Sequence, residues 1–165
     1  MPIARSDDSG APNNQERYVR RVFYAVSMCL LTAAGAASAQ DTRQLVKLPE
    51  PMQQHMLGNM RDHLATLNEI LGDLAKDDFD AAAKVTESRL GMSSLSPHGA
   101  AHMAPHMPQP MQDIGTTMHH AASRLVIVLQ NASLSRTPKA MRDVNGALHE
   151  VTMACEACHA NYRLR

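Results

Sequence analysis

The chain has no tryptophan, and only 3 Tyr and 2 Phe among its 165 residues. Any hydrophobic core must therefore be built from leucine, methionine, alanine and valine. Basic and acidic side chains number 16 each, so no basic excess points to a nucleic-acid partner. No stretch shows the strict alternation of apolar and polar residues that a half-buried strand requires. These absences favour a helical protein, and its length is typical of one domain.

The only long apolar run lies near the N-terminus and has the features of an export signal. Three arginines between positions 17 and 21 precede the run Val22–Ala34, and Ala37-Ser38-Ala39 follow it. A basic segment, a short apolar segment and a small-x-small cleavage site are typical of a secretory signal peptide. The alternative is a membrane anchor, but the run is shorter than the roughly 20 residues that a spanning helix needs.

Cleavage after Ala39 would divide the chain into a signal peptide with an N-terminal extension, residues 1–39, and a mature domain, residues 40–165. Cys29 would leave with the signal. Without the signal's 4 basic and 3 acidic residues, 12 basic and 13 acidic side chains remain. Such a domain has no strong field to steer a partner. We expect a periplasmic protein that has no membrane association once the signal is removed.

The last eleven residues contain Cys155-Glu156-Ala157-Cys158-His159. Two thiols at this spacing can add to the two vinyl groups of one haem, and the histidine is then placed to ligate its iron. C-x-x-C-H is typical of c-type haem attachment. On a helix all three side chains point to one side. A disulfide is the alternative in an oxidising compartment, but His159 and the lack of a thioredoxin-like βαβ pattern favour haem. The sequence predicts one covalent haem c on Cys155 and Cys158, with His159 as the proximal iron ligand.

Hydrophobic periodicity predicts four helices. The first begins near Pro49-Glu50-Pro51 and carries a stripe of Met52, Met56, Met60, Leu64, Leu67, Leu71 and Leu74. The second begins at Asp77-Asp78, which are good capping residues, and ends near Gly91. The third has an apolar face of Met111, Ile114, Met118, Ala122, Leu125 and Leu129. The fourth begins at Thr137-Pro138 and leads into the haem motif. The expected fold is all-α, an antiparallel four-helix bundle with a covalently attached haem.

The stretch from Cys155 to Arg163, which ends the fourth helix, resembles the cytochrome c-prime family, also called class II c-type cytochromes. That family is a four-helix bundle with C-x-x-C-H-x-x-Y-R near its C-terminus. The resemblance covers roughly residues 48–165, and only the C-terminal motif is specific. It implies one-electron transfer with redox partner proteins, or binding of a small gas, often as a homodimer. It also implies that Arg163 lies near the haem.

The distal haem ligand separates these two functions. In the family a first-helix residue faces the iron: a methionine suits electron transfer, whereas an apolar residue leaves five-coordinate iron open to NO or CO. Met52, Met56 and Met60 lie one turn apart, and Met56 is preferred because it is central; core filling is the other role open to each. We predict an electron carrier with Met56 as distal ligand. A five-coordinate NO- or CO-binding protein is the alternative. A haem enzyme is not expected, because no distal acid–base pair is evident.

The connection between the second and third helices, residues 92–110, is expected to be irregular. Residues 98–111 hold His98, His102 and His106 at four-residue spacing, interleaved with Met103, Met107 and Met111. Imidazole suits Cu(II) and thioether suits Cu(I), but three prolines interrupt any helix there. We favour a loop whose methionines cover one end of the bundle while its histidines face water. His119 and His120 on the third helix are expected to be partly exposed.

Overall fold

The computed structural model describes residues 13–15, 17–19, 21 and 40–164. Most of the predicted signal, including Val22–Ala34, Cys29 and the cleavage site, lies outside the described residues, so export stays a prediction. The chain divides into two units, 1–41 and 42–165. All the elements discussed below belong to the second unit.

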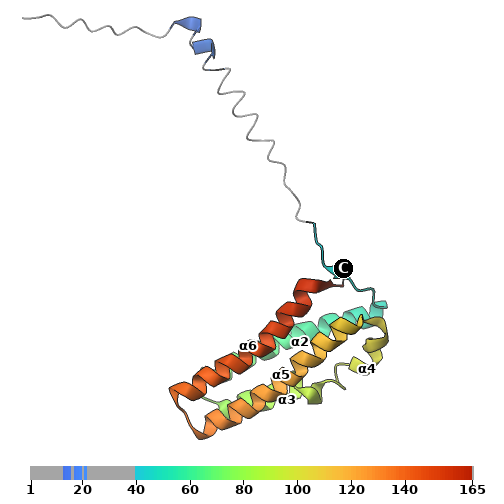
Figure 1. Cartoon of the computed structure of the whole chain (residues 1–165), viewed down its shortest axis with the longest axis vertical. Coiled ribbons are helices and arrows are strands. Elements are labelled where there is room, and N and C mark those ends of the chain that lie inside the picture. Colours follow the sequence, from blue (N-terminus) through green and yellow to red (C-terminus); the bar gives the residue numbers. More distant parts are fainter. Residues whose placement is uncertain (1–12, 16, 20, 22–39, 165) are drawn as a thin grey trace, which may run out of the picture. The chain divides into compact units, whose positions relative to one another are not determined.

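The prediction of an all-α protein is confirmed. Four long helices dominate the second unit: α2 (Glu50–Leu74), α3 (Phe79–Arg89), α5 (Gln109–Leu134) and α6 (Pro138–Asn161). They lie side by side, with α5 packed against both α3 and α6, and α3 packed against α2 (Figure 1). In the described part of the chain, no helix combines the length and apolar character needed to cross a membrane.

The helix starts follow the predicted capping residues. The Asp78 carboxylate accepts a hydrogen bond from the Ala81 N–H at 3.0 Å, and the Thr137 hydroxyl oxygen accepts one from the Ala140 N–H at 3.1 Å. Helices α2, α5 and α6 each have a proline in their first turn, where no backbone N–H is needed. The start of α6 was therefore correctly predicted from local chemistry, and because the helix ends at Asn161 the cysteine motif lies in its last two turns.

The core-facing side of α5 agrees with the predicted face, whereas that of α2 agrees only in part, because Met56, Met60, Leu67 and Leu74 do pack in apolar clusters. Leu125 and Leu129 on α5 are fully buried. On α2, in contrast, Leu64 is 70% exposed and Leu71 is 54% exposed. From Met52 to Leu64 the predicted stripe follows four-residue steps, and each such step rotates around the helix by about 40° because a turn takes 3.6 residues. The buried face shares Met56 with this stripe but continues through His63 and Ile70, at seven-residue spacing.

The connection between α3 and α5 is more regular than expected. It contains three short helical segments: η1 (Met92–Ser94), α4 (Ala100–Met103) and η2 (Ala104–His106). Glu87 holds the start of this connection, because its carboxylate accepts hydrogen bonds from the Ser93 N–H and from the hydroxyls of Ser93 and Ser123. A Cβ on Gly91 would collide with that carboxylate. A larger residue there would therefore displace the Glu87 carboxylate from these hydrogen bonds.

Two short strands were not predicted. β1 (Gln44–Leu45) pairs in parallel with β2 (Tyr162–Arg163), directly after α6. The Val46 N–H donates to the Arg163 carbonyl at 2.8 Å, and Gln53 Nε2 of α2 donates to the Leu164 carbonyl at 2.9 Å. These bonds fix the C-terminal residues beside the first turn of α2. Strands of two residues are too short to show a sequence period.

Candidate functional site

The cysteine motif lies on α6, as the sequence predicts. Cys155 and Cys158 are half-buried, and their thiols are not joined in a disulfide. Burial raises the pKa of both thiols, and Cys155 raises that of Cys158 further. Both groups are therefore neutral thiols at neutral pH. One side of α6 thus carries two free thiols three residues apart.

The two thiols face different surroundings. Cys155 packs against the main core, whereas Cys158 packs against a separate apolar group that we call the methionine cluster. The buried members of this cluster are Val46, Met56, Met103 and Met111, and its partly buried members are Leu48, Met60, Met107, Cys158, Tyr162 and Leu164. None of these side chains carries a charge. The expectation that methionines of the 98–111 segment cover an apolar region is confirmed for Met103 and Met111.

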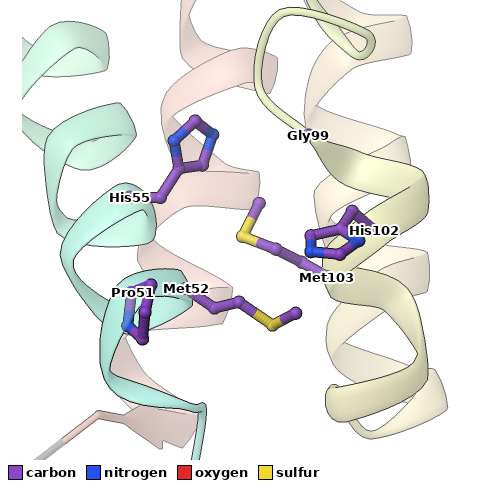
Figure 2. A pocket seen from close by; sticks show the side chains of 6 residues that line it. All are labelled: Pro51, Met52, His55, Gly99, His102 and Met103. Carbon is purple, nitrogen blue, oxygen red and sulfur yellow. The ribbon is translucent and has the colours of Figure 1, made fainter.

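The structure separates the three methionines proposed as distal ligands. Met56 is 8% exposed and belongs to the same cluster as Cys158. Met60 packs against that cluster from the next turn. Met52 instead lines a cavity of about 270 Å³ together with His55, Gly99, His102 and other residues of α2 and α4. Figure 2 shows Met52 and Met103 extending toward one another across this cavity. Burial and position therefore favour Met56 over Met52.

The remaining residues of the predicted haem site lie at the end of α6. His159 is exposed in its last turn, and its backbone carbonyl accepts a hydrogen bond from Arg43 Nη1 at 3.3 Å. Arg163 is partly buried in β2. The two thiols and the uncharged methionine cluster fit a haem, because a porphyrin has apolar faces and needs sulfur nucleophiles at its edge. His159, exposed on the same helical turn, would supply the imidazole for the iron.

The three histidines of the connection differ in their exposure. His102 and His106 are exposed, as the loop interpretation expects. His98 instead turns inward, and its Nδ1 lies 3.4 Å from His63 Nε2. His119 is only 6% exposed, so the expectation of partial exposure was wrong for it, although His120 is exposed.

His63, His98 and His119 form a group that sequence reasoning missed. Each offers a ring nitrogen, and these three atoms lie within 4.8 Å of one another. Burial, followed by the neighbouring His98 and His119, lowers the pKa of His63 to about 4; burial also lowers the pKa of His98 and His119. All three are therefore neutral at pH 7. The one hint in the sequence is that His63 lies seven residues after Met56 and seven before Ile70, which places it on the buried face of α2.

No protein-family model, curated protein or solved structure matches this chain. The chemistry of the site is therefore inferred from its own residues.

Proposed function

We propose that the protein is a periplasmic c-type cytochrome that carries single electrons between redox partner proteins. In this proposal the long helices form an antiparallel bundle that holds one haem c on Cys155 and Cys158. His159 is the proximal ligand and Met56 the distal ligand. The observation that carries the proposal is the pair of free thiols on one side of α6, with Cys158 in the same uncharged cluster as Met56.

The role of the cysteines is covalent attachment. Each thiol adds across a vinyl group: sulfur forms a thioether bond to one vinyl carbon, and the thiol hydrogen goes to the other carbon. The addition is redox-neutral and needs no oxidant. It does require both sulfurs as free thiols, which is the state of Cys155 and Cys158. The covalent links then hold the group against α6 even where the bundle opens locally.

The other residues set the environment of the iron. The haem, when bound, supplies one-electron chemistry. His159 would hold the iron through an imidazole nitrogen, and Met56 would supply a thioether from a buried position on α2. Met–His ligation raises the reduction potential of a haem. The uncharged methionine cluster would exclude water and disfavour the extra positive charge of the ferric state, which also raises the reduction potential.

The proposal is tested by expressing the full chain in a host that matures c-type cytochromes. We expect coloured protein whose pigment stays with the polypeptide in acidified acetone and on a denaturing gel. A double variant, Cys155→Ala with Cys158→Ala, should lose the covalent pigment. Cys29→Ser is the matched control, because it removes the third cysteine outside the motif and should leave the pigment unchanged. Colourless wild-type protein, or pigment extracted by the acetone, refutes the proposal.

A further inference from the structure

Three imidazoles from separate segments meet inside the protein, and none of them belongs to the cysteine motif. His63 comes from α2, His98 from the turn before α4, and His119 from α5. The His63 Nε2 to His98 Nδ1 distance is 3.4 Å. In a tetrahedral zinc site with Zn–N bonds of about 2.0–2.1 Å, the ligating nitrogens lie about 3.3 Å apart. The His63–His98 pair already has about that spacing. The His119 nitrogen lies within 4.8 Å of both, so a small rotation of its side chain would complete the set.

Hydrogen bonds orient His119 as a ligand. Its Nδ1 donates to the Leu90 carbonyl at 2.8 Å and lies 3.2 Å from the Ser94 hydroxyl oxygen. Because a carbonyl only accepts, Nδ1 carries the proton and the lone pair is on Nε2. Histidines that bind metals commonly donate their other N–H to such a carbonyl. Leu90 also caps the C-terminal end of α3, whose partial negative charge favours a cation nearby.

His98 is held in place through its backbone. Its carbonyl oxygen accepts from Asn59 Nδ2 at 2.9 Å and lies 3.0 Å from His55 Nε2, and both partners belong to α2. Gly99 follows with a φ of 65°, a left-handed conformation that favours glycine. The chain therefore turns sharply after His98 and leaves its ring directed at His63.

The composition of the group selects the type of metal. Three neutral imidazoles without a thiolate suit zinc or copper(II) rather than calcium or magnesium, which prefer oxygen. The neighbouring Asp62 carboxylate is paired with Arg89. Three protein nitrogens leave a fourth position for water. The alternative is a group of rings joined only by N–H···N hydrogen bonds.

We propose that His63, His98 and His119 form a binding site for one divalent transition-metal ion, zinc or copper(II), separate from the haem. The proposal does not depend on haem attachment, because none of its three ligands belongs to the cysteine motif or the methionine cluster. A zinc site here would link α2, the α3–α5 connection and α5.

The test uses the mature protein, purified without a histidine tag and treated with a chelator. It is then equilibrated with zinc sulfate, or separately with copper(II), and bound metal per chain is measured by mass spectrometry, with iron counted separately. We expect one zinc per chain. Copper(II) should give an electron paramagnetic resonance spectrum with nitrogen hyperfine splitting. Binding should weaken by at least about tenfold in His98→Ala and in His63→Leu.

The exposed neighbours provide controls. His120→Ala and His102→Ala should keep full binding, because both side chains face solvent. Circular dichroism establishes that each variant folds. If His63→Leu does not fold, His98→Ala decides, because His98 is only partly buried. Wild-type protein that binds neither metal, or a folded His98→Ala variant with unchanged affinity, overturns the proposal, as does equal loss in His120→Ala. Colourless protein that still binds zinc would refute haem attachment and leave this site supported.

Discussion

Replacing Met56 by leucine tests the distal ligand with little disturbance of packing. The Met56 side chain is 8% exposed, and its neighbours in the methionine cluster are thioethers and aliphatic carbons. Leucine keeps nearly the same apolar volume, so we expect a stability cost below about 1.5 kcal/mol. Alanine at this position would cost about 2–5 kcal/mol, because it leaves a cavity. Met56→Leu therefore removes the sulfur while leaving the fold intact.

The expected spectroscopic change is large. The wild-type haem should be low-spin, with a charge-transfer band from methionine sulfur to ferric iron. Met56→Leu should lose that band, become high-spin and bind carbon monoxide. Its reduction potential should fall on the order of 100 mV, since axial ligands shift haem potentials across a range of about 0.8 V. Absorption spectra of both oxidation states and a redox titration measure these effects.

Two neighbouring methionines provide controls. Met52→Leu alters a residue of the cavity in Figure 2, and Met60→Leu alters the next turn of α2. Both should keep the wild-type spectrum. If Met60→Leu loses the band while Met56→Leu keeps it, the ligand is Met60 and the reasoning from burial fails. If wild-type protein is already high-spin and binds carbon monoxide, the gas-binding alternative replaces the electron carrier.

Two further predictions concern stability. The pKa of His63 is about 4 in the folded protein against an ordinary value of 6.5, so the unfolded chain binds the proton first as pH falls. In metal-free protein, stability should therefore drop by about 3 kcal/mol between pH 6.5 and pH 4. Urea unfolding should show a smaller drop in His63→Leu, and an equal drop would contradict this assignment. Leu125→Ala, at a fully buried site, should cost about 2–5 kcal/mol, whereas Leu134→Ala, 86% exposed, should change stability by less than about 0.5 kcal/mol. Similar costs for the two would show that Leu125 is not in the core.

The elements with strong local signals were predictable from the sequence. Asp78 and Thr137 mark helix starts because their side chains satisfy backbone N–H groups that the helix leaves open. The apolar face of α5 was evident because its residues are aliphatic and regularly spaced. On α2, polar residues occupy part of the buried face, including Gln53, His63 and Thr66. Apolar periodicity alone therefore missed these polar residues and included Leu64 and Leu71, which are exposed.

The cysteine motif and the histidine group also differ in how far the sequence alone could predict them. Cys155, Cys158 and His159 are adjacent in sequence, so their shared side of a helix followed from geometry. The histidine group joins residues 63, 98 and 119, whose proximity depends on how α2 and α5 pack and on the turn at Gly99. Regular spacing instead highlighted His102 and His106, which face solvent. Contacts between distant segments leave no period in the sequence.

The two proposed sites share one face of α2, which predicts that they influence one another. Met56 and His63 are seven residues apart, or about 10 Å along the helix axis. If the iron lies beside Met56 and the ion beside His63, their separation is on the order of 10 Å, and at an effective dielectric constant of about 20 the ion disfavours the ferric state by about 3 kcal/mol before screening by salt. Zinc should therefore raise the haem potential on the order of 100 mV in wild-type protein. His98→Ala should show no rise at the same zinc concentration. A potential unchanged by bound zinc would mean that the iron lies much farther from His63 than a Met56 ligand allows.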